Sequence, residues 1–207
     1  MKRAESFPRR RRALLLVAAF VVQALCTLAA AQQSEIKLDP AKTSVVWTMG
    51  DVLHTVKGTF RLKSGEIIFD PRSGSASGQV VVDATSGNSG NGMRDSKMKT
   101  EVLESGRYPE IVFSPKHVSG YVAGQESAIV QLAGDFTIHS GTHPLILSLP
   151  ITVRGTVVDA RTTFTVPYEQ WGMKNPSTLF LKVGSTVEIS ISTTGDLQTA
   201  GSSRAPN

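Results

Sequence analysis

The chain has only one cysteine among its 207 residues, Cys26. Cys26 lies in an apolar stretch from Ala13 to Ala31, which follows a basic run at Arg9–Arg12 and ends in Ala29-Ala30-Ala31. A basic start, a short apolar run and a small-x-small end predict a secretory signal peptide that is cleaved near Ala31. The mature chain then has no thiol, which excludes disulfide scaffolds, cysteine nucleophiles and thiolate metal sites.

The apolar stretch is also too short and too interrupted to favour a membrane anchor. A spanning helix needs about 20 consecutive apolar residues, whereas Gln23 and Thr27 break this run. We therefore expect export to the periplasm. The general secretory route is favoured over the twin-arginine route, because no Ser or Thr directly precedes the arginines.

An excess of one charge is missing once the first segment is set aside. Residues 1–31 carry six of the 22 basic and one of the 17 acidic side chains, so the rest has 16 of each. A nucleic-acid-binding protein needs a basic face, and we expect no nucleic-acid partner.

Motifs for catalysis are missing as well. The segment Gly74-Ser75-Ala76-Ser77-Gly78 does not have the Gly-x-Ser-x-Gly spacing of a nucleophile elbow. No glycine-rich phosphate loop leads from a strand into a helix. His139 and His143 are separated by a turn and have no third ligand near them, so we expect no metal and no cofactor.

Alternation of apolar and polar residues dominates the chain between residues 36 and 193. Such a period of two is typical of half-buried antiparallel strands. The apolar faces comprise Val45, Trp47 and Met49; Gly58, Phe60 and Leu62; Val130, Leu132, Phe136 and Ile138; Leu145, Leu147, Leu149, Ile151 and Val153; Thr162, Phe164 and Val166; and Val187, Ile189 and Ile191. We predict turns at Lys63-Ser64-Gly65, Asp70–Gly74, His139-Ser140-Gly141 and Arg154-Gly155.

One segment departs from this period. Met93–Glu104 contains helix-forming residues, Asn91 is placed to cap it, and Gly106 and Pro109 end it. The pattern predicts about eight strands and one short helix. Periodicity alone leaves a closed barrel and a sandwich both open.

Four ordered blocks carry a resemblance to a known family. They are His54–Phe60 with Gly65–Pro71; Val82–Asn88 with Met93–Met98; Tyr108–Phe113; and Gly134–Pro144. In these blocks the chain resembles the YceI-like family of periplasmic polyisoprenoid-binding proteins. The resemblance implies an eight-stranded antiparallel lipocalin-like barrel with one short helix at its mouth, enclosing an apolar tunnel. We expect a signal peptide at 1–31, the barrel at 32–194 and a disordered tail at 195–207.

The resemblance implies a lipid-binding protein that carries or stores a long isoprenoid, quinone or acyl chain, and not an enzyme. Two alternatives are an exported enzyme acting on a prenyl or acyl lipid and a β-sandwich interaction module. Transient membrane contact and a homodimer are left open. The candidate ligand-binding residues are Trp47, His54, Phe60, Arg94, Asp95, Phe113, Phe136, Tyr168, Trp171 and Phe180.

Two of these candidates depend on particular hypotheses. Arg94 either meets a polar head group at the mouth or pairs with Asp95 to anchor the helix. Where the family often has Arg-x-Asp-aromatic-Gly, this chain has Tyr168-Glu169-Gln170-Trp171-Gly172. Neutral hydrogen-bonding groups then replace a charged pair, which predicts a preference for neutral heads over diphosphates.

Overall fold

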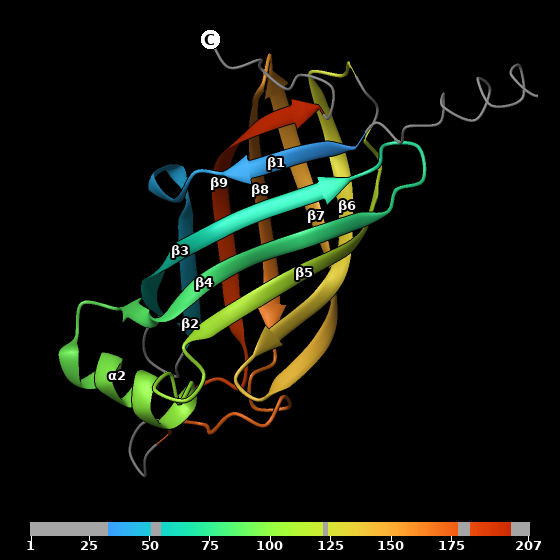
Figure 1. The fold of residues 1–207 in the computed structure, drawn as a ribbon. Coiled ribbons are helices and arrows are strands. Elements are labelled where there is room, and N and C mark those ends of the chain that lie inside the picture. The colour runs from blue at the N-terminus through green and yellow to red at the C-terminus, as the bar shows by residue number, and fades with distance from the viewer. Residues whose placement is uncertain (1–32, 51–54, 122–123, 178–182, 200–207) are drawn as a thin grey trace, which may run out of the picture. The chain divides into compact units, whose positions relative to one another are not determined.

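A computed structural model describes residues 33–50, 55–121, 124–177 and 183–199. Nearly all regular structure in these ranges is β-strand (Figure 1). The strands are β1 (Ser34–Leu38), β2 (Ser44–Gly50), β3 (Thr55–Phe69), β4 (Ala76–Asn88), β5 (Glu110–Ser119), β6 (Ser127–Ile138), β7 (Gly141–Arg154), β8 (Val157–Val166) and β9 (Val187–Thr199). A single 3-10 turn at Pro40–Lys42 separates β1 from β2.

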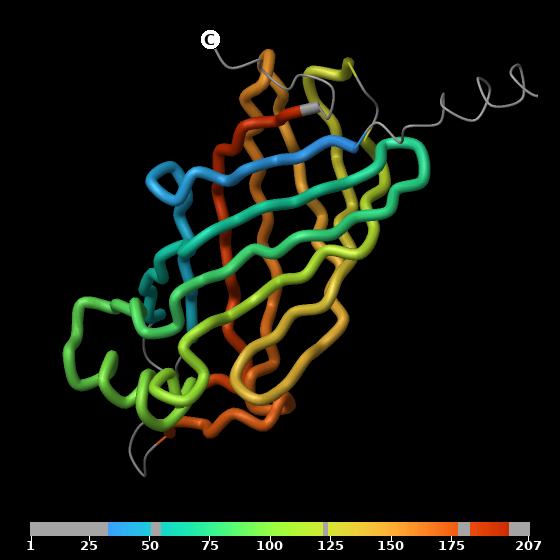
Figure 2. Tube along the Cα trace, viewed as in Figure 1, coloured from blue at the N-terminus to red at the C-terminus, as the bar shows by residue number. Residues whose placement is uncertain are grey.

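The strands close into an antiparallel barrel with eight wall positions. The order is β3-β2-β9-β8-β7-β6-β5-β4, and pairing between β3 and β4 completes the circle. The short strand β1 shares the position of β2, because both lie between β3 and β9. Figure 2 follows β3, β4 and β5 side by side across the near wall of the barrel. The predicted barrel is confirmed, and the sandwich alternative is wrong.

The predicted alternation is confirmed in the wall. Val45, Trp47, Val130, Leu132 and Leu147 are buried residues whose strand neighbours are exposed or half-buried. Facing side chains on different strands gather into two adjoining apolar clusters inside the barrel. The period of two in the sequence therefore produces a wall whose inner face is predominantly apolar.

One predicted turn is wrong. Lys63-Ser64-Gly65 lies inside the continuous strand β3, where the pairing with β4 shifts between Leu62 and Ser64. Lys63 is thus the extra residue of a β-bulge, a device that lets a strand absorb one residue and bend. Its ammonium group extends outward to Glu110 of β5, at 2.5 Å. The other three predicted turns are present.

The predicted tail also begins too early, because residues 195–199 complete β9 and pair with β1. Residues 1–31, including the predicted signal peptide and Cys26, lie outside the described residues, as do residues 200–207. The helices in the described ranges are too short and too polar to span a lipid bilayer.

The predicted helix is found at one end of the barrel. Helix α2 (Gly92–Lys97) continues as a π-helical turn over Met98–Val102. The Asn91 side chain accepts a hydrogen bond from the backbone N–H of Arg94 at 3.1 Å, so the expected cap is confirmed. Lys97 Nζ donates to the Pro176 carbonyl at 3.0 Å, and Lys174 Nζ lies 2.6 Å from a Glu101 carboxylate oxygen. These contacts tie the helix to the segment that follows β8.

Candidate functional site

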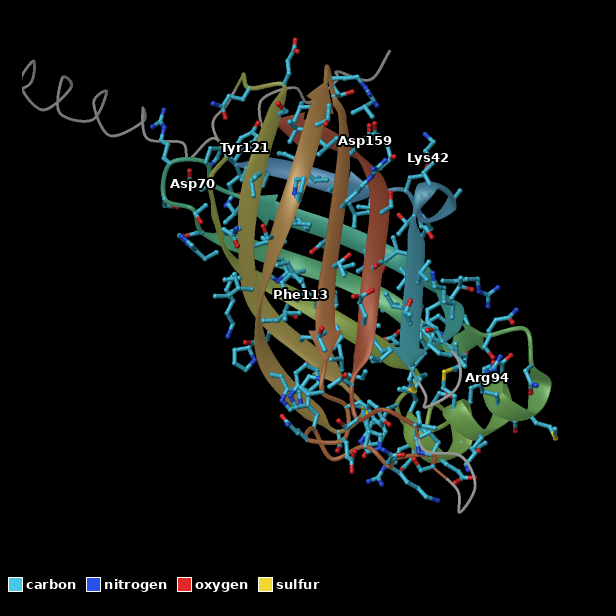
Figure 3. The ribbon with its side chains drawn as sticks, turned by 180° about the vertical axis from the view of Figure 1, so that it is seen from behind. Lys42, Asp70, Arg94, Phe113, Tyr121 and Asp159 are labelled. Carbon is cyan, nitrogen blue, oxygen red and sulfur yellow. The ribbon has the colours of Figure 1, made fainter. Side chains whose placement is uncertain are left out.

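The barrel is incompletely filled, and its interior contains two adjoining cavities. The narrow chamber has a volume of about 160 Å³ and lies toward the end that carries Tyr121. The wide chamber has a volume of about 480 Å³ and lies toward the end that carries α2. In Figure 3, Tyr121 and Arg94 mark these opposite ends, and Phe113 lies between them. The wide chamber falls in the range of about 300–1,000 Å³ that is usual for small-molecule sites.

The narrow chamber is almost wholly apolar. Among the described residues that line it, only Tyr121, Thr162 and Thr193 carry a polar side-chain atom, and none carries a charge. The remainder are Val, Leu, Ile, Phe and Ala side chains from the strands. Since an unpaired polar or charged group is costly to bury here, this chamber suits hydrocarbon alone.

The wide chamber combines apolar strands with a more polar rim. Asn91, Arg94 and Lys97 reach it from α2 and the preceding loop, and Tyr168 reaches it from the segment after β8. Methionine is concentrated here: Met49, Met93, Met98 and Met173 all line the wide chamber, and the remaining methionine of the chain is Met1. Unbranched, polarisable methionine adapts its shape to irregular contents.

A ring of five side chains separates the two chambers. Val82, Ile111, Phe136, Phe164 and Ile191 line both cavities and come from five different strands. The rings of Phe136 and Phe164 meet edge to face, with centroids 5.8 Å apart. We call this ring the waist.

The structure brings six of the ten predicted residues to the chamber walls. Trp47, Phe60, Arg94 and Tyr168 line the wide chamber, Phe113 lines the narrow chamber, and Phe136 lines both. His54 and Phe180 lie outside the described residues. Asp95 and Trp171 are described but do not belong to either lining.

Arg94 and Asp95 act on the same loop residue without forming an ion pair with each other in the described part of the chain. Arg94 Nε donates to Ser89 Oγ at 2.7 Å, and its NH2 group donates to the Ser89 carbonyl at 3.0 Å. The Asp95 carboxylate accepts from Ser89 N–H at 2.9 Å and from its hydroxyl at 2.5 Å. Asp95 therefore anchors the loop before α2, and Arg94 both anchors it and reaches the rim.

Tyr168 is buried, with 2% of its surface exposed, and its hydroxyl donates to the Gly184 carbonyl at 2.7 Å. Burial, together with the nearby Glu169 carboxylate, raises the pKa of Tyr168 to about 12. Gln170, which was expected to act beside it, is exposed. The two residues therefore do not face the chamber together, and this part of the neutral-head argument is wrong.

Trp171 contacts the waist but lines neither chamber. Its indole stacks on His143, with centroids 4.0 Å apart and planes 5° from parallel, and it also meets Phe136 at 5.9 Å. The inward-facing His143 is thus occupied by an aromatic contact. Trp171 supports a waist residue instead of lining a chamber.

The sequence reasoning missed Lys97 and the methionines of the wide chamber. Met49 lies on the same apolar strand face as Trp47, and this pattern could have predicted that both residues line one cavity. Lys97 and Met98 follow Arg94 by three and four residues, which places them on its side of a helix. Met173 gave no signal, because it lies in an irregular segment.

Comparisons with known proteins agree with this geometry. UPF0312 proteins of Vibrio cholerae are 30% identical over 95 residues, which cover 45% of this chain and 48% of the relative. The chain thus matches about half the length of these curated relatives. Two solved structures share the fold with a TM-score of 0.62 each. Burkholderia cenocepacia BcnA is 16% identical, with 76% of this chain and 98% of BcnA covered.

The second structure is a polyisoprenoid binding domain from Saccharophagus degradans implicated in plant cell wall breakdown. It is 15% identical, with 79% of this chain and 98% of that domain covered. At these identities the two structures establish the fold alone. The sequence itself matches the model of the YceI-like domain over residues 36–195, which is well over half of the chain. The protein therefore belongs to the YceI-like family.

Proposed function

We propose that this protein binds one long isoprenoid, quinone or acyl chain inside its barrel and acts as a carrier or store, not as an enzyme. The observation that carries the proposal is the pair of adjoining apolar chambers inside a closed wall. Along β9 the lining runs from Val187 to Leu197. At a rise of about 3.3 Å per residue this is about 33 Å of strand, which suits a long, thin ligand.

The hydrophobic effect alone can supply the affinity. Each buried methylene contributes about 0.8 kcal/mol, and association costs about 4–15 kcal/mol. Between about 5 and 19 buried carbons therefore offset the cost, and further carbons add net affinity. The polyisoprenoid-binding domain of Saccharophagus degradans, which has the same fold, supports this ligand class.

The distribution of polar groups gives the ligand a direction. We place the tail in the narrow chamber, because its described lining bears no charge. The head then lies in the wide chamber near Asn91, Arg94 and Lys97. These three side chains offer an amide and two cations, so the rim can hydrogen-bond either a neutral or an anionic head group.

Native mass spectrometry of protein purified without detergent tests the proposal. We expect a retained lipid, which collision releases and tandem spectra identify. Stripped protein should take up an added prenyl alcohol. Failure both to retain lipid and to reload would contradict the carrier function. A change in the mass of the bound lipid during incubation would favour the enzyme alternative instead.

Export belongs to the same proposal. The basic run, the apolar stretch and Ala29-Ala30-Ala31 support cleavage near Ala31 and release into the periplasm. N-terminal sequencing of the exported protein decides this. A chain that still begins at Met1, or one with a lipid on Cys26, would contradict it.

Exchange of a lipid requires contact with a membrane at some stage. Met93 is 84% exposed at the rim of the wide chamber, and Arg94 and Lys97 line the same rim. An apolar side chain beside two cations suits brief contact with an anionic bilayer surface.

A homodimer stays a prediction. The exposed Ile129 and Ile146 on the outer faces of β6 and β7 are the residues through which we would test it.

A further inference from the structure

The waist lies where the two chambers adjoin, because its five side chains line both of them. Val82 and Ile111 are direct partners across β4 and β5, and Phe164 and Ile191 come from the adjacent strands β8 and β9. Phe136 faces Phe164 from β6. A chain that enters from the wide chamber must pass between these side chains to reach the narrow one.

On the β6 side of the waist, three aromatic side chains pack against one another. Phe136 meets Trp171, and Trp171 is stacked on His143. His143 is itself the cross-strand partner of Phe136 on β7, so the three rings form one compact group. Phe136 therefore has little room to move away from an incoming chain, because the rings of Phe164 and Trp171 both pack against it.

We propose that the waist, through Phe136, Phe164 and Ile191, selects the bound chain by its cross-section and so decides how much of it enters the narrow chamber. The inference rests on the proposed lipid-binding function and adds a determinant of specificity to it. A linear acyl chain is thinner than a methyl-branched prenyl chain. The two ligand classes therefore differ in cross-section, which is the property that a constriction can distinguish.

Two inward variants and one outward variant test the waist. Ile191→Phe narrows it, Phe164→Leu widens it, and Ser192→Phe places the same added ring on the exposed outer face of β9. Each stripped protein is incubated with an equimolar mixture of linear prenyl alcohols of increasing length. The complexes are then weighed by native mass spectrometry. A second mixture pairs each prenyl alcohol with an unbranched fatty alcohol of equal length.

In the wild type we expect affinity to rise roughly fourfold per added methylene until both chambers are filled, and then to level off. In Ile191→Phe the affinity should level off at a shorter chain length than in the wild type. For longer chains it should be roughly fourfold lower than in the wild type for each carbon that is kept out of the narrow chamber. Phe164→Leu should increase the binding of prenyl alcohols relative to unbranched ones. Ser192→Phe should behave as the wild type.

Two results would overturn the inference. One is an unchanged plateau in Ile191→Phe together with an unchanged preference in Phe164→Leu. The other is complete loss of binding in both variants while Ser192→Phe still binds, because the waist would then be needed for binding without selecting the chain. A wild type that binds no chain at all would instead remove the proposed function on which the inference rests.

Discussion

The two tryptophans of the chain occupy different surroundings, which makes each a reporter for a different part of the barrel. Trp47 lines the wide chamber and is only 5% exposed. Trp171 lines neither chamber and packs against His143 and Phe136. Replacing one tryptophan by phenylalanine leaves the other as the only indole. We therefore predict that a ligand in the wide chamber changes the fluorescence of Trp47 much more than that of Trp171.

Phenylalanine is the substitution of choice because truncation to alanine would cost too much. A buried Trp→Ala change costs about 3–5 kcal/mol, a large part of a total stability of about 5–15 kcal/mol. Trp47→Phe removes two ring carbons and the indole nitrogen. The two carbons, at about 0.8 kcal/mol each, cost about 2 kcal/mol, whereas the nitrogen is buried with no hydrogen-bond partner among the described residues. Part of this cost reflects close packing: a Cβ at Gly58 would lie 2.5 Å from the indole of Trp47. Both single-tryptophan proteins should remain folded.

The assay is a titration with a fatty alcohol that carries bromine on its chain, since bromine quenches an indole only at close range. The Trp171→Phe protein, which keeps Trp47, should be strongly quenched. The Trp47→Phe protein, which keeps Trp171, should be quenched weakly at the same occupancy. Native mass spectra of the same samples establish that occupancy. Equal quenching of both proteins, or none of Trp47 in a loaded complex, would refute the placement of the ligand.

Two further predictions concern stability. In Gly134→Ala the new Cβ would lie 2.3 Å from the Ser114 carbonyl oxygen, so chemical denaturation should show a loss of about 1–3 kcal/mol. In Gly106→Ala the new Cβ would meet no atom of the described residues within 4 Å, so stability should change by less than about 1 kcal/mol. The pKa of Tyr168 is about 12 in the folded protein and about 10 in the unfolded chain. The neutral phenol therefore contributes fully to the free energy of unfolding below pH 10, and this contribution is lost as the pH rises toward 12. Tyr168→Phe should therefore weaken the alkaline loss of stability, and an unchanged alkaline profile would contradict this.

The inner wall could be predicted because a strand allows only two orientations. Once Trp47 or Leu147 is assigned to the apolar face, its strand neighbours follow without any knowledge of tertiary structure. The turn at Lys63-Ser64-Gly65 failed for a related reason. The same residue types that favour turns also occur at bulges, and here Lys63 is the extra residue of a bulge within a strand paired along its whole length.

The waist could not be predicted, because its level depends on how far each strand slides past the next. Phe136 and Phe164 belong to different hairpins, and Val82 and Ile111 are separated by the helical segment. A shift of two residues in any pairing keeps every side chain on its face but moves it to another level of the barrel. Alternation identifies which side chains enter the barrel. Only the register decides which of them meet.

The error over Tyr168 and Gln170 has a local cause. Residues two apart share a face in a strand, and the argument for a neutral head group assumed that geometry. Instead, Trp171 N–H donates to the Pro167 carbonyl and Met173 N–H donates to the Tyr168 carbonyl, so the chain here coils like a helix. In such a coil residues two apart point in nearly opposite directions. Gln170 is accordingly exposed, whereas Tyr168 lines the wide chamber, as does Met173. Where the family often has an acidic side chain, the neighbour that Tyr168 has inside the barrel is a thioether. The polar side chains that we propose for the head group are instead Asn91, Arg94 and Lys97 at the rim.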